Sequence, residues 1–472
     1  MGGQDAADVT GPGPLSGPAP SSEQDRAAAD VARFPLGRLA ALTPTGRARV
    51  PIAWALYDFG NTIFSAAIVS TAISLWLTAP ERLGQDTGQL VLSLAVAISV
   101  GINAVVSPIL GALSDRGGRR LPFLLFFTLL AIVPTAMIGP TPALVGAALF
   151  AVANFAYEAA LIYYNAMLAT VSVPATRGTL SGIGVAVGYL GTIFVSLVLI
   201  GLGITEQPEP IFGIAAVLFA AFALPIFIVV REPVHVGVKT LSWSDVTASI
   251  GQVIVTLRNA GAVPGLGRFL LARFFYSDAV ATLIVVMSVV AVRAMGFSQG
   301  EFLAILLMLA IIAIIASLGW GWMVDRFGPK RTLVVVLASW VVGLVGGVVA
   351  LGAPGTAFGN GLFIVAGAIL GSGLGGVQVA DRVFMVQLSP PRQLGEFFGL
   401  YGLVGKGSQV VGQVIFGVIV FLFFDALGNG AYQLAILSLL VTMAIGLWLI
   451  WPVSDRWRDW AIEELVSTEP AT

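Results

Sequence analysis

The sequence predicts an all-α integral membrane protein whose twelve transmembrane helices form two pseudo-symmetric bundles of six. Composition is the first observation behind this fold class. Of the 472 residues, 57% are hydrophobic and only 10% are charged, whereas a soluble fold carries about 25% charged residues. The other two observations are repeated apolar runs of membrane-spanning length and a charged loop motif that occurs twice.

The apolar runs are long enough to cross about 30 Å of hydrocarbon, and short breaks rich in charge, Pro or Gly separate them. The longest polar interval, residues 231–266, divides the runs into two sets of six. The predicted spans are 52–78, 89–113, 122–139, 142–170, 181–204, 211–230, 267–293, 301–323, 332–351, 360–388, 397–424 and 430–452.

These spans divide the chain into five segments. Residues 1–50 lack an apolar run and are expected to form a disordered cytoplasmic tail, because they bury too little surface to offset the entropy of ordering. One bundle over 51–230 and a second over 267–453 are expected on either side of a cytoplasmic central loop, residues 231–266. Residues 454–472 are expected to form a second cytoplasmic tail.

Lys and Arg are concentrated in alternate breaks, and the positive-inside rule places such breaks in the cytoplasm. Both termini belong to this basic set, so we expect a multi-pass protein of the cell membrane with both termini cytoplasmic. The abundance of Arg, Ala and Gly indicates a GC-rich bacterial source and agrees with that location. The basic positions are Arg47, Arg49, Arg116, Arg119, Arg120, Arg177, Arg231, Lys239, Arg258, Arg326, Lys330, Arg331, Arg392, Arg456 and Arg458.

A Gly-x-x-x-Asp-Arg-x-Gly motif follows the second span at 111–118 and recurs after the eighth span at 321–328. Each Asp is expected to accept hydrogen bonds from the N-terminus of an adjoining helix, and the Arg that follows it is expected to bridge to neighbouring helices. We interpret both turns as cytoplasmic gating loops; the alternative is that they are only retained basic turns. The predicted gating residues are Asp115, Arg116, Arg119, Arg120, Asp325, Arg326, Lys330 and Arg331.

Several spans carry polar side chains at helical spacing on an otherwise apolar helix. In the first span, Asp58, Asn61, Thr62 and Ser65 fall at i, i+3, i+4 and i+7, so they share one face, which must look inward. An ionised carboxylate at mid-membrane costs roughly 2.5 to 3.5 kcal/mol and needs a partner, a proton or water. The residues predicted to line a substrate or ion pathway are Asp58, Asn61, Asn154, Glu158, Asn165, Arg273, Asp278, Gln378, Asp381, Arg382, Lys406 and Gln409.

Four acids in this set oppose three bases. If every base pairs with an acid, one carboxylate remains and can carry a proton, because a low dielectric favours its neutral form. Asp58 and Glu158 are the predicted candidates for that unpaired carboxylate. The alternative interpretation is that the charges only join helices and never contact a substrate.

The sequence excludes several functional classes. It contains no Cys and one His, His235 in the central loop, so thiolate or His-based metal sites and Ser-His-Asp catalysis lack their residues. The formal charge of −1 offers no basic excess for nucleic acid. No enzyme activity, metal or cofactor is expected, and because no ATP-binding motif is present, energy must come from a gradient of H⁺ or Na⁺.

The repeated loop resembles the loop motif of the major facilitator superfamily. The first span, Trp54-Ala-Leu-Tyr-Asp-Phe-Gly-Asn61, resembles the first-helix signature of the Atg22-like (UMF1) transporters within it. Further similarity to that family lies in Phe274-Phe-Tyr-Ser-Asp278 with Thr282, and in Asp381-Arg382 followed by Glu396-Phe-Phe-Gly-Leu-Tyr401 and Lys406. The resemblance covers about 52–452 and implies amino-acid efflux by a major facilitator fold.

We therefore expect a secondary active transporter that moves a small polar or zwitterionic, amino-acid-like solute by proton-linked alternating access. One alternative is a sugar:cation symporter of the glycoside-pentoside-hexuronide type. Another is a non-transporting membrane receptor or scaffold, which would leave seven intramembrane charges without a use. The expected partners are the solute and membrane lipid, with no nucleic acid, and the expected oligomeric state is a monomer.

Overall fold

A computed structural model describes residues 35–204, 208–232 and 265–454 of the chain. Within these ranges every regular element is helical. Most of the predicted N-terminal tail, nearly all of the central loop with His235, and the C-terminal tail with Arg456 and Arg458 lie outside the described residues.

The first six spans are formed by the helices of the N-terminal half. The first span is continuous but has three parts, in which a π-helical segment separates two α-helices. In order, the elements are α3 (Arg49–Phe64), η1 (Ser65–Ala72), α4 (Ile73–Thr78), α5 (Gly84–Arg116), α6 (Leu121–Met137), α7 (Ala143–Val171), the 3₁₀ turn η2 (Pro174–Thr176), α8 (Arg177–Gly201) and α9 (Pro208–Val229).

The second six spans repeat this order, and their first member also contains a π-helical segment, which here forms its end. The elements are α11 (Leu266–Val289), η3 (Val290–Ala294), α12 (Gln299–Phe327), α13 (Pro329–Ala350), α14 (Ala357–Leu388), the 3₁₀ turn η4 (Pro391–Gln393), α15 (Leu394–Leu427) and α16 (Gly430–Ile450).

Eleven helices in the described part are long and apolar enough to cross a membrane, and the twelfth, α6, is apolar but only 17 residues long. Each predicted span overlaps one of these helices, which confirms the predicted fold class of a multi-pass membrane protein. The helices run past the predicted ends, as in α5, which begins five residues before the predicted span 89–113. Hydropathy detects the part of a helix that lies in hydrocarbon, whereas polar residues continue the same helix outside it.

The end of the predicted tail is ordered, contrary to expectation. Residues 35–40 form the short helix α2 (Pro35–Ala40). Beyond it, the carbonyl of Leu42 accepts a hydrogen bond of 3.1 Å from the amide of Val173, and the Leu42 side chain is buried. This segment therefore packs beside the end of α7, because Leu42 offers an apolar anchor that the average composition of residues 1–50 conceals.

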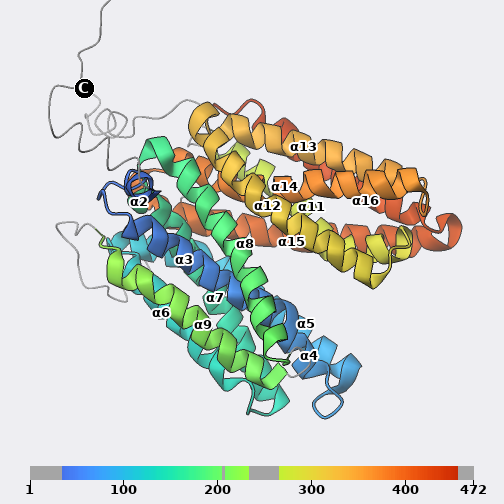
Figure 1. The fold of residues 1–472 in the computed structure, drawn as a ribbon, viewed down its shortest axis with the longest axis horizontal. Coiled ribbons are helices and arrows are strands. Elements are labelled where there is room, and N and C mark those ends of the chain that lie inside the picture. Colours follow the sequence, from blue (N-terminus) through green and yellow to red (C-terminus); the bar gives the residue numbers. More distant parts are fainter. Residues whose placement is uncertain (1–34, 205–207, 233–264, 455–472) are drawn as a thin grey trace, which may run out of the picture.

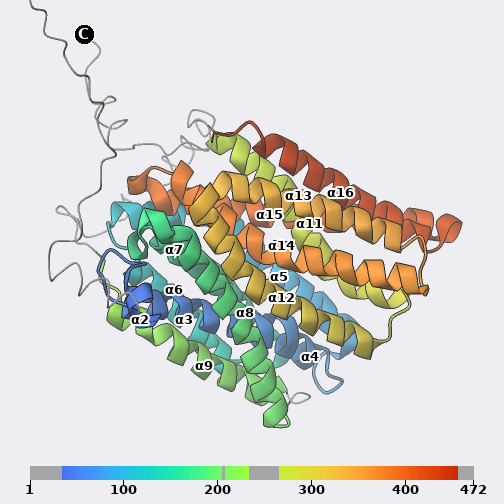
Figure 2. The same ribbon diagram turned by 45° about the horizontal axis from the view of Figure 1, so that its top comes forward.

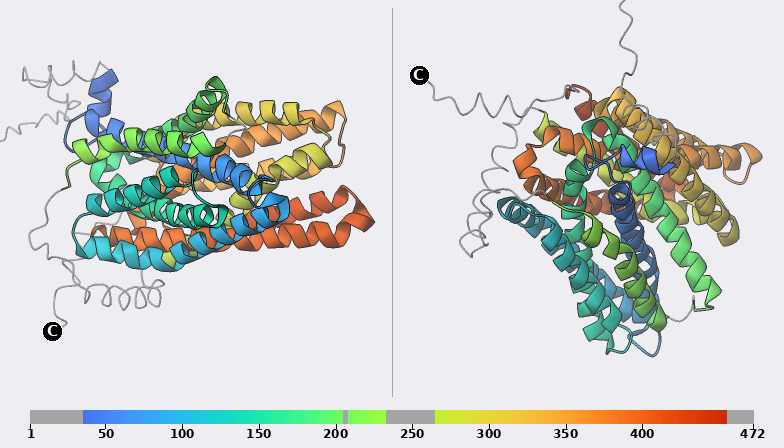
Figure 3. Two further views of the ribbon diagram at one scale, coloured as in Figure 1. Left: turned by 90° about the horizontal axis from the view of Figure 1, so that it is seen from below. Right: turned by 60° about the vertical axis from the view of Figure 1, so that its left-hand side comes forward.

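The two halves form separate bundles that meet at one end. Figure 1 shows the first-half helices (blue to green) and the second-half helices (yellow to red) together at the left, near α2, and diverging toward the right. The rotated views in Figures 2 and 3 keep the same grouping. Between bundles, α5 packs against α15 and α8 packs against α12. We call the end formed by residues 115–120 and 325–331 the basic face.

An aromatic cluster holds the first bundle together beside its inward polar face. The rings of Trp54 and Tyr164 stack with their centroids 4.6 Å apart, and those of Tyr57 and Tyr164 stack at 5.1 Å. All three side chains are fully buried. Stacked aromatic rings add about 0.5–1.5 kcal/mol each beyond the area they bury. They fix α3 against α7 and so position the carboxylate of Asp58, the next residue after Tyr57.

Candidate functional site

A cavity with two adjoining lobes lies between the bundles. The lobes enclose about 300 and 310 Å³. Side chains of α5, α7, α11, α14 and α15 line the first lobe, and side chains of α3, η1, α7, α8, α14 and α15 line the second. Both lobes share Leu161, Asn165, Gln378 and Tyr401, so they form one space to which both bundles contribute.

The first lobe holds an ion pair between Arg273 of α11 and Asp381 of α14. Tyr401 of α15 supports both partners. Its hydroxyl donates a 2.9 Å hydrogen bond to Asp381, and its ring lies 3.2 Å from the Arg273 guanidinium carbon, measured to the ring centroid. The pair is thus held by charge, a hydrogen bond and a cation–π contact within the second bundle.

A second ion pair crosses the cavity from one bundle to the other. The ammonium group of Lys406 on α15 contacts the carboxylate of Glu158 on α7. Both side chains are partly exposed, at 15% for Lys406 and 19% for Glu158. This pair is therefore accessible from the cavity, where a solute can compete for either partner.

In the second lobe, Asp58 of α3 and Arg382 of α14 face one another from opposite bundles and attract electrostatically. The Arg382 guanidinium lies 5.5 Å from the Trp54 ring and 5.9 Å from the Tyr164 ring. Its Nη1 atom and the Oδ1 atom of Asn61 are buried and have no hydrogen-bond partner among the described residues. Two unsatisfied polar atoms beside one lobe are unusual in a native interior.

Ten of the twelve predicted pathway residues line the cavity. Asn154 lies elsewhere: it is buried and its amide donates a 2.8 Å hydrogen bond to Ser99, which joins α7 to α5 within the first bundle. Asp278 is also off the cavity and accepts a 2.7 Å hydrogen bond from the amide of Gly412. Helical spacing identifies the face that points away from lipid, but not which neighbouring helix that face meets. The members of the predicted set that line the cavity are Asp58, Asn61, Glu158, Asn165, Arg273, Gln378, Asp381, Arg382, Lys406 and Gln409.

The prediction that Glu158 is an unpaired carboxylate is wrong, because Lys406 reaches it from the other bundle. Asp58, the other candidate, faces Arg382. Of the four acids in the predicted set, Asp278 is the one that has no Lys or Arg partner among the described residues. The excess of one acid over the bases could be predicted from the sequence. Which acid lacks a basic partner could not, because pairing across the bundle interface depends on the tertiary arrangement.

Tyrosines were missed as cavity residues. Tyr401 contacts both members of the Arg273–Asp381 pair, and the Tyr189 hydroxyl accepts a 3.0 Å hydrogen bond from Gln378 across the bundle interface. Helical spacing could have found Tyr401, because it precedes Gly405 by four residues and Gln409 by eight on the same face of α15.

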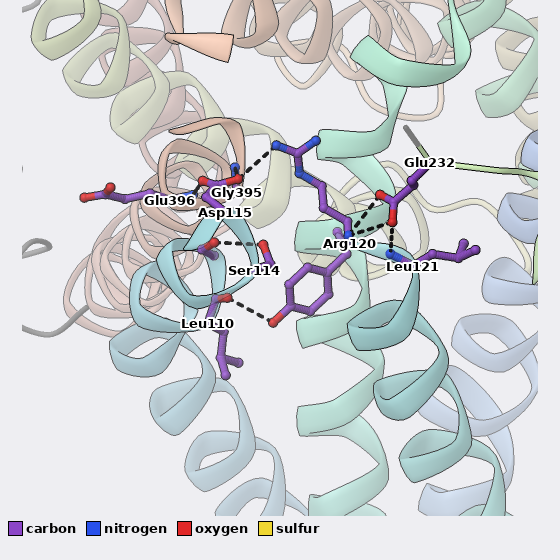
Figure 4. Close-up of polar contacts among 10 residues, drawn as sticks. Leu110, Ser114, Asp115, Arg120, Leu121, Glu232, Gly395 and Glu396 are labelled. Atoms are coloured by element: carbon purple, nitrogen blue, oxygen red, sulfur yellow. Dashed lines mark hydrogen bonds and ion pairs between the residues drawn. The ribbon is translucent and has the colours of Figure 1, made fainter. Parts of the chain in front are cut away.

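The two motif aspartates hold the bundles together at the basic face. Asp115 accepts hydrogen bonds of 3.0 and 2.9 Å from the amides of Gly395 and Glu396 at the start of α15, and Arg120 donates to the same carboxylate at 2.9 Å (Figure 4). Asp325 accepts 2.7 Å bonds from the amides of Gly178 and Thr179 at the start of α8. The hydrogen bonds to helix N-termini expected of both carboxylates are therefore present.

The motif glycines permit these contacts. A Cβ atom on Gly111 would lie 1.9 Å from the carbonyl oxygen of Gly395, and one on Gly321 would lie 2.6 Å from that of Gly178. In each copy, the first glycine of the motif thus lets the backbone of its helix touch the helix that the motif aspartate caps.

The basic residues of the two gating loops differ in their contacts, whereas the sequence predicted the same bridging role for the Arg after each motif Asp. Arg120 is the one that contacts Asp115, and its own amide and that of Leu121 donate 2.9 Å bonds to Glu232 (Figure 4). Arg326 is exposed and makes no ion pair with the described part of the chain, so the bridging role expected of it is not seen. Arg116, Arg119 and Arg331 are exposed as well, although Arg116 and Arg331 interact with neighbouring groups, and Lys330 lies 5.8 Å from the Trp451 ring.

Within the described ranges, no group of three or more His, Cys, Asp or Glu side chains is placed to hold a metal ion.

The sequence is similar to one protein family and to bacterial and fungal proteins. Residues 85–459 match the sequence model of the family described as "Vacuole effluxer Atg22 like". An uncharacterized MFS-type transporter of Bacillus subtilis (strain 168), YxiO, is 26% identical over 411 residues, covering 84% of this chain and 92% of the relative. Autophagy-related protein 22 of Yarrowia lipolytica (strain CLIB 122 / E 150) is 25% identical over 447 residues, covering 75% and 74%.

Solved structures agree on the fold. The proton:xylose symporter XylE bound to 6-bromo-6-deoxy-D-glucose superposes with a TM-score of 0.68 at 14% identity, covering 88% of this chain and 98% of XylE. A bacterial homologue of the iron transporter ferroportin in its outward-facing state gives 0.63 at 13% identity, covering 85% and 97%. With the matched family model spanning most of the sequence, the chain belongs to the Atg22-like family of major facilitator transporters.

Proposed function

We propose that this protein moves a small zwitterionic solute, of the amino-acid class, across the cell membrane by alternating access coupled to protons. The observation that carries the proposal is the second lobe, where Arg382 and Asp58 face one cavity from opposite bundles. A solute with a carboxylate and an ammonium group offers each of them a partner of opposite charge.

The guanidinium of Arg382 is suited to the solute carboxylate. Its buried Nη1 atom has no hydrogen-bond partner among the described residues, and a carboxylate can accept two parallel hydrogen bonds from a guanidinium. Asp58 and the Oδ1 atom of Asn61 are acceptors, which suits an ammonium group. The resemblance to Atg22-like transporters, which implies amino-acid efflux, supports the same class of solute.

The contacts at the basic face support alternating access. There, Asp115 and Asp325 join the bundles, while the bundles diverge at the opposite end (Figure 1). We place the basic face in the cytoplasm, because positive residues beside membrane helices are retained there. The structure then corresponds to an outward-facing form, and rocking of the bundles would break these contacts and open the cytoplasmic side.

The test is exchange in proteoliposomes. Vesicles loaded with unlabelled amino acids should accumulate the labelled amino acid by counterflow, whereas vesicles loaded with sugars should not accumulate labelled sugar. Sugar counterflow without amino-acid counterflow would instead identify the sugar:cation symporter.

The variant Arg382→Gln should weaken the apparent affinity for the solute by roughly 30-fold or more, since a buried charge partner is worth about 2 kcal/mol or more. Arg293→Gln is the matched control, because it removes an exposed guanidinium from η3, outside the cavity. Equal affinities for both variants and the unchanged protein would contradict the proposed role of Arg382.

A further inference from the structure

Asp278 is a buried carboxylate just behind the cavity, and it has no basic partner within the part of the chain that the structure describes. Asp278 is 2% exposed and Thr282, one helical turn later on α11, is fully buried. Their neighbours on α11, Ser277 and Ala281, line the first lobe. Asp278 and Thr282 thus lie next to residues that line the cavity, which is the space that we assign to the solute.

Three oxygen atoms converge there on a glycine of α15. A Cβ atom on Gly412 would lie 2.5 Å from both carboxylate oxygens of Asp278 and 2.5 Å from the hydroxyl of Thr282. The amide of Gly412 donates a 2.7 Å hydrogen bond to Oδ1 of Asp278. Only glycine leaves room for this arrangement, so the close approach of α11 and α15 depends on position 412.

The Thr282 hydroxyl indicates that the site binds a proton. Its buried hydroxyl has no hydrogen-bond partner among the described residues. If Asp278 takes up a proton on Oδ2, the resulting O–H can donate to that hydroxyl, while Oδ1 still accepts from Gly412. The neutral acid can thus hold both contacts, with the Thr282 hydroxyl as acceptor and the Gly412 amide as donor.

No charged side chain in residues 35–204, 208–232 and 265–454 stabilises the ionised form of Asp278. The interactions that act on Asp278 are its burial and the bond from Gly412. Arg273 and Lys406 are engaged with Asp381 and Glu158. The elements packed around Asp278 carry other ionisable side chains, and none of those in the described residues contacts it. They are Arg268, Arg273, Tyr276 and Arg293 on α11 and η3, Asp381 and Arg382 on α14, Glu396, Tyr401, Lys406 and Asp425 on α15, and Tyr432 on α16.

We propose that Asp278, Thr282 and Gly412 form the proton-binding site of this transporter, separate from the solute cavity. The inference rests on the proposed proton-linked transport. α15 connects the two functions, because it carries Gly412 at this site, Lys406 in the cavity and the N-terminus that Asp115 caps. Protonation of Asp278 weakens its hydrogen bond with the Gly412 amide, because a neutral acid is a poorer acceptor than a carboxylate, and α15 transmits this change to Lys406 and to the helix end that Asp115 caps.

Infrared spectroscopy of the purified protein tests proton binding without any solute. A change of pH should produce a difference band from a buried protonated carboxyl group, and Asp278→Asn should remove that band. Asp425→Asn, which removes an exposed carboxylate from the neighbouring α15, should leave it in place. A band that survives in Asp278→Asn, or that disappears in Asp58→Asn instead, would overturn the assignment.

A transport assay then tests whether proton binding at Asp278 is coupled to movement of the solute. In proteoliposomes, Asp278→Asn should lose accumulation driven by a pH gradient and the accompanying proton influx, yet retain counterflow of the labelled amino acid. Loss of counterflow in a folded variant, or accumulation that needs Na⁺ and not H⁺, would overturn the proposal. If the unchanged protein exchanges no amino acid at all, the proposed solute is wrong, while the infrared result still decides whether Asp278 binds a proton.

Thr282→Val serves where Asp278→Asn does not fold, because it removes one hydroxyl and keeps the shape of the side chain. Loss of one hydrogen bond should lower the apparent proton affinity by about threefold to tenfold, seen as a shift of the infrared titration to lower pH. Thr282→Ser should restore the original titration. A Thr282→Val titration that coincides with that of the unchanged protein would overturn the role of Thr282.

Discussion

At the scale of single residues, every base inside the cavity stands opposite an acid on another helix. Arg273 pairs with Asp381 inside the second bundle, whereas Lys406 and Arg382 face acids of the first bundle. A charge inside a membrane protein is costly without such a partner. The two cross-bundle pairs must therefore separate or exchange partners when the bundles move, which a solute with both charges can assist.

The Lys406–Glu158 pair provides a test at this scale. Glu158→Gln leaves Lys406 without its partner and should abolish accumulation of solute, because an unpaired charge beside the cavity opposes closure around it. The exchanged pair Glu158→Lys with Lys406→Glu should recover part of the uptake. Uptake of labelled amino acid into proteoliposomes measures the activity of the single variant and of the exchanged pair. An exchanged pair as inactive as the single variant would show that each charge is needed at its own position.

At the scale of elements, the crossings of α5 with α15 and of α8 with α12 depend on backbone contact at glycine. The two crossings are equivalent in the two halves, since each joins a motif helix to the helix whose N-terminus the motif aspartate caps. Carboxylates at a helix N-terminus gain from the helix dipole as well as from hydrogen bonds. The motif thus combines a steric requirement at Gly111 or Gly321 with an electrostatic one at Asp115 or Asp325.

Gly111→Ala should therefore open the basic face. Its methyl group would lie 1.9 Å from the Gly395 carbonyl, and overpacking costs about 1–3 kcal/mol, which shifts a two-state equilibrium roughly 5- to 150-fold. The chain contains no Cys, so a single Ser114→Cys can report opening through its rate of labelling. Gly101→Ala is the matched control on α5, because a Cβ atom there meets nothing within 4 Å. Equal labelling rates in both variants would contradict the steric role of Gly111.

At the scale of the whole molecule, the sequence alone predicted the spans and the twofold repeat, because both depend on local composition. Polar faces on α3, α7, α14 and α15 were also predictable, since helical spacing is a local property. Three features were not predictable from the sequence. They are the partner of Glu158, the burial of Asn154 and Asp278 away from the cavity, and the ordered segment at Leu42. Each of these depends on which helices lie side by side, which is a property of the tertiary fold.

The orientation of the whole molecule gives the last prediction. Arg119 lies exposed in the basic face and Arg293 lies exposed in η3, which ends the first span of the second bundle. With the basic face in the cytoplasm, a membrane-impermeant thiol reagent should label Arg119→Cys only in inside-out vesicles and Arg293→Cys only in right-side-out vesicles. Neither exposed side chain supports the cavity, so both variants should retain counterflow, which serves as the control for folding. Labelling with the opposite sidedness would invert the protein in the membrane and make the structure an inward-facing form, with the closed face outside and the cavity facing the cytoplasm.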